Sequence, residues 1–170
     1  HVLNSGGIVN YAGFDRGNYV RAGIIQYGVC SGKIAEGYKP VFTFKSRILF
    51  MKTLEEDSDI SYGRTATLKK GTMLATIAVG YADGFRREIS NKGCVKIHGV
   101  DCPVRGKVCM DMFMAEIPEE IKDKVSEGDE VILYGDNIGE QAKLMNISIY
   151  ELFTGIGRRV ERVYINNIEK

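Results

Sequence analysis

From Pro40 onward, apolar residues fall into short runs separated by glycines and polar turns. These runs are rich in β-branched and aromatic side chains, and several alternate between apolar and polar positions. They cover residues 41–51, 73–79, 94–97, 104–110 and 128–135. Short runs of this kind are typical of strands in an antiparallel barrel or sandwich. We therefore predict a mainly β, antiparallel fold for a domain that spans residues 41–170.

Residues 1–40 follow a different pattern. Val2 and Leu3 resemble the end of a strand, residues 4–7 (Asn-Ser-Gly-Gly) a tight polar turn, and residues 19–28 a second strand that leads into a glycine turn. This order is typical of the last βα elements of a TIM-like (β/α) barrel. Because two such units cannot close a barrel, we predict that residues 1–40 are an incomplete end of one.

Helical signals come late in the chain. Residues 140–145 form a weak helix candidate, and Ser148 with Glu151 forms a capping box that predicts a helix through Phe153. Residues 159–165 alternate again and predict a closing strand.

Composition narrows the possible functions. The chain has 170 residues, of which 26% are charged, and a formal net charge of +1, so nothing favours nucleic acid or an anionic membrane as partner. No apolar run reaches membrane-spanning length. Four cysteines without a C-x-x-C pair and only two histidines predict reduced thiols in the cytoplasm, with neither a disulfide framework nor a metal site. His98 is expected in a solvated turn. A start at His1, without methionine, predicts a piece of a longer protein.

The stretch 60–111 holds three glycine-flanked signatures that can display reactive side chains. They are Ile-Ser-Tyr-Gly at 60–63, Ala-Val-Gly-Tyr-Ala-Asp-Gly-Phe-Arg-Arg at 78–87 and Gly-Lys-Val-Cys-Met-Asp at 106–111. Glycine lets the backbone turn sharply and approach a ligand. Tyr62 is a candidate base, although a free phenol, with a pKa near ~10, acts at neutral pH only when its anion is stabilised. Each residue alone also fits an ordinary turn or core position, and only the ordered set is specific.

This ordered set resembles the alanine racemase family of pyridoxal-phosphate enzymes and its serine-racemase relatives. Residues 1–28 resemble the last barrel strands through His-x-x-Asn-Ser at 1–5, Val-Arg-x-Gly-Ile at 20–24 and Tyr-Gly at 27–28. The β-domain motifs are the three signatures above, Gly-Asp-x-Val at 128–131, Ile-Tyr-Glu at 149–151 and Arg-Val-x-Arg at 159–162. Departures from the family pattern are Gly6-Gly7, Ala22 and Glu161.

The resemblance implies a role for each matching residue. Ser5, the amides of Gly23 and Ile24, and Tyr150 would hold the cofactor phosphate, which suits a hydroxyl and unhindered N–H groups. Arg21 would face the pyridine nitrogen and, since a guanidinium only donates, leave it unprotonated. The resemblance also implies that Tyr62 is the base for the L-substrate and that Met110 binds the substrate carboxylate through its N–H. Tyr81 and Asp111 would shape the pocket.

The resemblance further implies a homodimer in which Tyr62 reaches into the neighbouring subunit's barrel. The lysine that binds pyridoxal 5'-phosphate as a Schiff base belongs on an early barrel strand, outside this chain, so the chain alone is expected to be inactive. The expected reaction is alanine racemisation for peptidoglycan synthesis. Two alternatives stay open: a serine racemase of the glycopeptide-resistance type, attached to a membrane domain, and a non-catalytic β-barrel binding module. Tyr150 favours alanine over serine.

Overall fold

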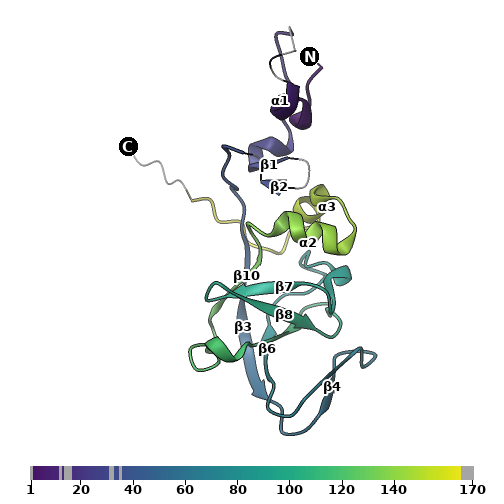
Figure 1. The fold of residues 1–170 in the computed structure, drawn as a ribbon, viewed down its shortest axis with the longest axis vertical. Helices are drawn as coiled ribbons and strands as arrows, with labels where there is room; N and C mark the ends of the chain where they lie inside the picture. Colours follow the sequence, from purple (N-terminus) through teal and green to yellow (C-terminus); the bar gives the residue numbers. More distant parts are fainter. Residues whose placement is uncertain (1, 12, 14–16, 31–32, 35, 166–170) are drawn as a thin grey trace.

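The computed structural model describes residues 2–11, 13, 17–30, 33–34 and 36–165. Its largest element is a closed antiparallel barrel with the strand order β10-β3-β6-β9-β8-β7. The barrel strands are β3 (Phe44–Thr53), β6 (Met73–Ile77), β7 (Cys94–Ile97), β8 (Val100–Arg105), β9 (Phe113–Glu116) and β10 (Glu130–Tyr134). The predicted mainly β, antiparallel fold is confirmed, and its closure makes it a barrel rather than a sandwich. The barrel lies at one end of an elongated molecule, and residues 2–30 lie at the other (Figure 1).

Alternation along the strands fills the barrel with apolar side chains. In β7, Val95 and Ile97 are fully buried, whereas Cys94 and Lys96, which alternate with them, are partly exposed. Phe85 stacks between two neighbours inside, with ring centroids 4.5 Å from Phe113 and 5.5 Å from Tyr134. Burial of such rings supplies much of the hydrophobic stabilisation of a small barrel.

A small hairpin extends beyond the barrel. It consists of β4 (Ser58–Ile60) and β5 (Ala66–Leu68), which pair antiparallel. Ile60 packs with Leu54 and Leu74 in a separate hydrophobic cluster beneath the hairpin. This cluster holds the base of the hairpin, so its turn at residues 61–65 has a fixed position. Two short 3-10 helices, η3 (Arg87–Ile89) and η4 (Glu119–Ile121), complete the barrel connections.

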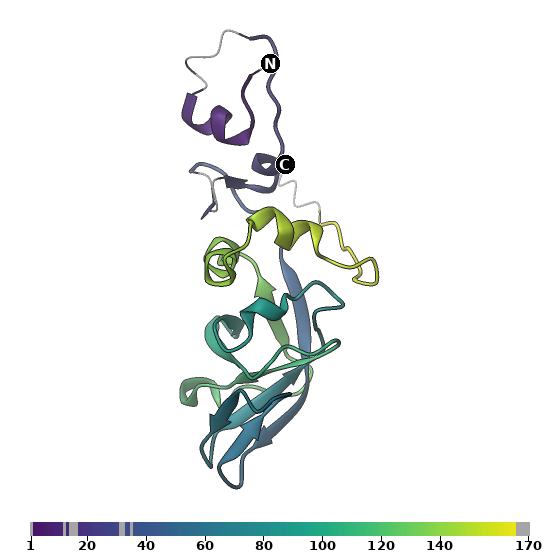
Figure 2. The same cartoon turned by 90° about the vertical axis from the view of Figure 1, so that its right-hand side faces the viewer.

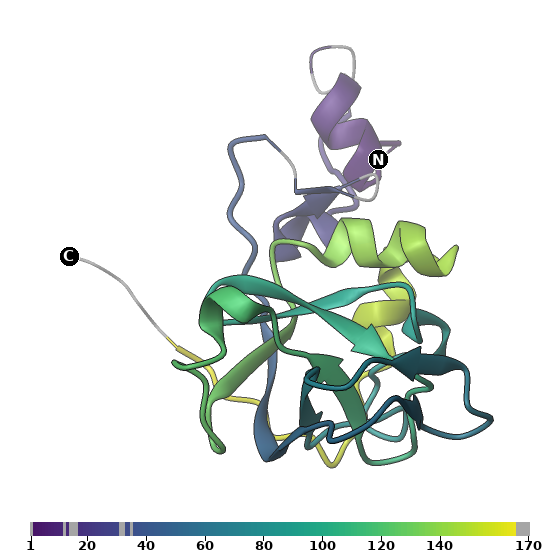
Figure 3. The same ribbon diagram turned by 60° about the horizontal axis from the view of Figure 1, so that its bottom comes forward.

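Two helices follow the barrel, as the sequence predicted. They are α2 (Ile138–Met145) and α3 (Ile149–Thr154), and both cover one side of the barrel between it and residues 2–30 (Figure 3). The predicted capping box is present, because the Ser148 hydroxyl accepts from the backbone N–H of Tyr150 and the Glu151 carboxylate accepts from that of Ser148. The Phe153 ring packs against that of Tyr27, with their centroids 5.2 Å apart, so α3 also supports the N-terminal part.

The N-terminal part differs from the prediction in its local structure. It contains α1 (Ser5–Tyr11), the 3-10 helix η2 (Ile24–Tyr27) and a hairpin of β1 (Val29–Cys30) and β2 (Lys33–Ile34). The turn predicted at residues 4–7 is wrong, because the Asn4 side chain accepts from the Gly7 N–H and α1 begins there. The strand predicted at residues 19–28 is also wrong. Only Arg21 pairs, in an isolated parallel bridge to Asn4.

Two other strand predictions also fail. The predicted strand at residues 104–110 ends at Arg105, because Gly106 has φ +75°, a left-handed value that breaks the ladder. The strand predicted at residues 159–165 does not form. There the Arg162 guanidinium donates to the carbonyls of Ile156, Gly157 and Val160, which ties the chain into a turn.

Two further observations bear on the predictions from composition. All four cysteines are thiols. Within the described ranges of the chain, no helix combines the length and the apolar character that crossing a membrane requires.

Candidate active site

Tyr62 lies in the turn between β4 and β5, where the sequence placed it. The turn is sharp: Ser61 and Gly63 both have positive φ, at 64° and 73°. A positive φ is strained for serine, so its side chain must be held to keep the turn. The Tyr62 side chain itself is 74% exposed, and its phenol has no hydrogen-bond partner among the described residues. The fold thus presents a phenol to the surroundings rather than burying it.

Ser61 fastens this turn to the loop at residues 106–111. Its hydroxyl donates to the Lys107 carbonyl at 2.7 Å and lies 3.7 Å from the Cys109 sulfur. Close packing reinforces the contact, because a Cβ at Gly106 would lie only 2.5 Å from the Ser61 Cβ. A surface pocket of about 390 Å³ lies beside the turn. It is lined by Ser61, Tyr62, Thr76, Cys109, Met112, Phe113 and Met114. The sequence reasoning gave Ser61 no such role.

The same loop is joined to the turn that carries Tyr81. The N–H groups of Tyr81 and Ala82 donate to the carbonyls of Cys109 and Met110, each at 3.0 Å. These bonds require a glycine at position 80, since a Cβ there would overlap both carbonyl oxygens. Three predicted site residues, Tyr62, Tyr81 and Met110, therefore come from turns that are bonded in series.

The Met110 amide is open in this structure. Its backbone N–H donates to none of the described residues, and the residue is 54% exposed. Tyr81 beside it is 44% exposed. An open N–H group next to exposed aromatic and apolar surface can bind a carboxylate.

Asp111 is paired rather than open, which the sequence did not indicate. Its carboxylate accepts from Arg159 Nη2 at 2.5 Å, and Arg159 Nε donates to Asp83 at 2.6 Å. The hydrogen bond to Asp83, followed by that to Asp111, raises the pKa of the Arg159 guanidinium. Asp83 and Arg159 stood inside the motifs but received no role, because sequence spacing does not show that residues 83, 111 and 159 meet.

At the other end of the molecule, Ser5 meets the backbone around Gly23. The Ser5 side chain is buried, and its oxygen accepts from the N–H groups of Gly23 at 3.1 Å and Ile25 at 3.3 Å. Its hydroxyl proton and the Ile24 N–H are donated to none of the described residues. The Gly23 amide, which was expected to bind the phosphate, is therefore already used by Ser5. The Ser5 hydroxyl proton and the Ile24 N–H remain as donors of the kind that suits a phosphate.

Arg21 and Tyr150 are both exposed. Arg21 donates through Nη2 to the Val2 carbonyl at 3.1 Å, and its backbone N–H donates to Leu3. Tyr150 is half exposed in the first turn of α3, and α3 packs through Phe153 against Tyr27 of η2.

The predicted site residues therefore form two groups. One, with Ser5, Arg21, Gly23, Ile24 and Tyr150, lies in the part of the molecule that contains α1, η2 and α3. The other, with Tyr62, Tyr81, Met110 and Asp111, lies on turns of the barrel and its hairpin. Figure 2 shows the hairpin end of the barrel and residues 2–30 at opposite ends of the molecule.

His98 lies in an exposed turn, as expected, and its ring also contacts a carboxylate. It has φ +51°, and its Nε2 lies 2.7 Å from Asp129, which also accepts from the Ser126 N–H. These hydrogen bonds, that of His98 first, lower the pKa of the Asp129 carboxyl. The described residues contain no group of three or more His, Cys, Asp or Glu side chains arranged to hold a metal ion.

With this geometry in hand, comparisons with known proteins are informative. Residues 41–164 match the family model "Alanine racemase, C-terminal domain". An alanine racemase of Fusobacterium nucleatum is 39% identical over 97% of this chain and 47% of its own length. One of Halothermothrix orenii is also 39% identical, over 99% of this chain and 46% of its own length. The chain thus spans about half the length of the curated relatives that it matches.

Solved structures give the same result for the fold. Alanine racemase of Clostridium difficile 630, in complex with cycloserine, superposes with a TM-score of 0.88 at 37% identity, covering 98% of this chain and 45% of that one. The enzyme of Bartonella henselae, with covalently bound pyridoxal phosphate, gives 0.87 at 32% identity, covering 96% and 46%.

Proposed function

This chain belongs to the alanine racemase family through its C-terminal domain, and on that premise we propose that it is part of a pyridoxal-phosphate racemase that interconverts L- and D-alanine. Its matched region covers residues 41–164, and its relatives at 35–39% identity are alanine racemases. Residues 1–40 would then be the end of the cofactor-binding barrel. The isolated parallel bridge between Asn4 and Arg21 supports this, since parallel pairing is characteristic of such barrels.

The observation that carries the proposal is the set of bonded turns around Tyr62. The exposed phenol, the open Met110 N–H and the exposed Tyr81 come from turns that are hydrogen-bonded in series through the loop at residues 106–111. Racemisation needs a proton donor and acceptor on each face of the substrate α-carbon, and a group that holds the carboxylate still. Tyr62 would remove or return the proton on one face, and the Met110 N–H would bind the carboxylate.

The residues around Ser5 fit the phosphate of the cofactor. A carboxylate or phosphate oxygen could accept from the unused Ser5 hydroxyl and the unused Ile24 N–H. Tyr150 would contribute its phenol, and Arg21 would face the pyridine nitrogen and donate to it. When bound, pyridoxal phosphate supplies an electron sink that acidifies the substrate α-hydrogen. An arginine partner keeps that sink weak, because the guanidinium donates a hydrogen bond to the nitrogen but does not transfer its proton.

Two copies of the chain would be required for one site. Tyr62 lies on the hairpin side of the barrel, whereas the phosphate-binding group lies in the part that contains α1 (Figure 1). A head-to-tail homodimer would bring the Tyr62 turn of one subunit to the Ser5 group of its partner. The four thiols suit a reducing compartment, so we place the enzyme in the cytoplasm.

The test is a racemisation assay of the full-length parent protein with pyridoxal phosphate. L-alanine and L-serine are supplied separately, and D-amino acid is measured by chiral chromatography. We expect L-alanine to be racemised at a clearly higher kcat/KM than L-serine. A higher kcat/KM for L-serine would support the serine-racemase alternative, and no conversion of either amino acid would overturn the proposed activity.

A further inference from the structure

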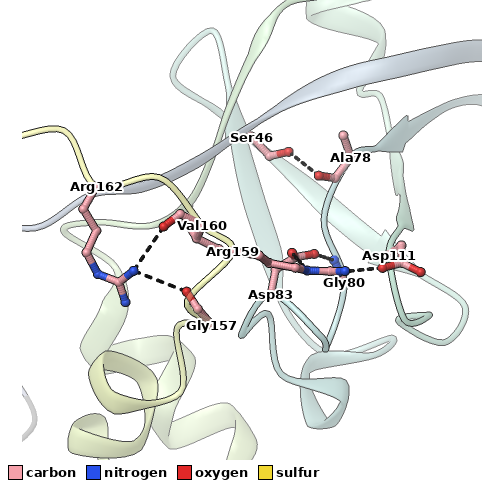
Figure 4. Close-up of polar contacts among 9 residues, drawn as sticks. All are labelled: Ser46, Ala78, Gly80, Asp83, Asp111, Gly157, Arg159, Val160 and Arg162. Atoms are coloured by element: carbon pink, nitrogen blue, oxygen red, sulfur yellow. Dashed lines mark hydrogen bonds and ion pairs between the residues drawn. The ribbon is translucent and has the colours of Figure 1, made fainter.

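Arg159 connects two turns that are far apart in the sequence. Its guanidinium donates through Nε to Asp83 and through Nη2 to Asp111, at 2.6 and 2.5 Å (Figure 4). Asp83 belongs to the turn of Tyr81, and Asp111 directly follows Met110. The planar, always charged guanidinium can hold two carboxylates at a fixed separation.

Each carboxylate is itself tied to a residue of the candidate substrate pocket. Asp83, whose side chain is only 15% exposed, also accepts from the Gly80 N–H at 2.9 Å and so closes the turn that displays Tyr81. Asp111 is more exposed, at 55%, and Arg159 is the one cation that pairs with it among the described residues. Loss of Arg159 would release the Asp111 carboxylate, and with it the backbone next to Met110, from this anchor.

Arg159 is held in place from behind. Arg162 donates to the carbonyls of Gly157 and Val160 (Figure 4) and also to that of Ile156. The Gly157 N–H donates to the Asp83 carbonyl at 2.9 Å. This turn fixes the backbone that carries Arg159, so the guanidinium is delivered to the two carboxylates with little freedom.

We propose that Arg159 is a positioning residue that sets the distance between Tyr81 and the Met110 N–H, and through it the affinity for the substrate carboxylate. This inference rests on the proposed function. Arg159 does not touch the substrate; it acts through Asp83 and Asp111. Arg159 and Asp111 are each about half exposed, so their pair adds little to global stability, and the effect of Arg159 should fall on the local geometry of the pocket.

The experiment uses the full-length parent enzyme and four forms: parent, Arg159→Gln, Arg159→Lys and the control Arg158→Gln. Arg158 is exposed and pairs with no carboxylate of the described residues, so its substitution removes one positive charge without opening the clamp. Four quantities are measured: KM and kcat for alanine in both directions, inhibition by propionate as a non-reacting carboxylate, and hydrogen exchange at the Tyr81 and Ala82 amides.

For Arg159→Gln, we expect KM for both enantiomers and the inhibition constant of propionate to rise about tenfold, because small displacements of a positioning group weaken binding strongly. The value of kcat should change by less than about threefold, as for lost uniform binding. Exchange at both amides should accelerate. Arg159→Lys should give values of KM, propionate inhibition and exchange between those of the parent and of Arg159→Gln, since an ammonium reaches one carboxylate at a time. Arg158→Gln should match the parent in all of them.

Each other pattern overturns the inference. Unchanged KM with faster exchange would make the clamp merely structural. Raised KM with unchanged exchange would mean that Arg159 attracts the substrate by charge alone. If KM and amide exchange both stay at parental values, the Asp83–Arg159–Asp111 contacts do not act on the pocket. If the parent itself racemised neither amino acid, the proposed function would be overturned. Hydrogen exchange at the Tyr81 and Ala82 amides would then be the one test of whether Arg159 holds the two turns together.

Discussion

Gly80 offers a direct test of how the barrel turns are joined. In Gly80→Ala, the new methyl group would overlap the carbonyl oxygens of Cys109 and Met110 by about 1 Å, judged against ordinary C···O contacts. The loop at residues 106–111 must therefore retreat. The bonds from the Tyr81 and Ala82 N–H groups, both 3.0 Å long, would stretch beyond hydrogen-bonding range.

The expected cost follows from those two bonds. At about 0.5–1.5 kcal/mol each, the free energy of unfolding should fall by about 1–3 kcal/mol. Urea denaturation of the 170-residue chain, followed by circular dichroism, would show a lower midpoint with an unchanged slope. Gly135→Ala is the matched control, because its nearest neighbours are the movable methyl groups of Ile132 and Thr43, at 3.3 and 3.8 Å.

The control should stay within about 0.5 kcal/mol of the parent chain, because its tightest contact is with a side-chain methyl group that needs to shift by only a few tenths of an ångström, rather than with backbone. If Gly80→Ala also stayed within that limit, the two turns would not depend on close backbone approach. The series of bonded turns that carries the proposed function would then lose its basis.

Two substitutions and one labelling experiment test other parts of the structure. Asp129→Asn should lower the urea midpoint at pH 7, because the hydrogen bond from His98 is the main cause that lowers the pKa of Asp129 in the folded chain. The ionised carboxylate therefore stabilises the fold fully above its unfolded pKa of ~3.9, and this stabilisation is lost as the pH falls through the folded pKa. Below that pH the urea midpoints of variant and parent should converge. Ser5→Ala should accelerate hydrogen exchange at the two amides bonded to Ser5 and, in the full-length enzyme, weaken pyridoxal-phosphate binding in equilibrium dialysis; unchanged exchange would contradict the assigned contacts. Burial raises the pKa of the Cys102 thiol to about 12, so this thiol should react with a disulfide reagent only after unfolding. Peptide mapping of the labelled chain would show this, and rapid labelling of the folded chain would contradict the position of Cys102 inside the barrel.

The sequence was sufficient where local pattern and burial agree. Alternation in β7 and β10 and the capping box at Ser148 each express one physical signal that neighbouring residues reinforce, and these elements form where predicted. The glycine-flanked turns at Tyr62 and Tyr81 were also predictable, because few other residues accept their backbone angles.

The sequence failed where a side chain from elsewhere takes over the backbone. Residues 19–28 have strand propensity, but the distant Ser5 hydroxyl binds two of their N–H groups and the chain forms a 3-10 helix. Residues 159–165 alternate like a strand, yet the Arg162 guanidinium folds them into a turn. Such tertiary hydrogen bonds override propensity and have no signature in local sequence.

The pairing of candidate site residues was hidden for the same reason. Nothing in the spacing of residues 83, 111 and 159 indicates that one guanidinium joins both carboxylates. By contrast, the exposure of Tyr62 agrees with the role that the family resemblance implied.

The most direct test of the account is Tyr62→Phe in the full-length enzyme. Because the phenol is exposed and has no partner among the described residues, folding and pyridoxal-phosphate binding should stay at parental levels, while racemisation falls at least ~10²-fold. In deuterated solvent, α-hydrogen exchange of L-alanine should be lost far more than that of D-alanine, since Tyr62 serves only one face. Racemisation at the parental rate, or equal loss of both exchanges with intact folding, would contradict the assignment of Tyr62 as the base for the L-substrate.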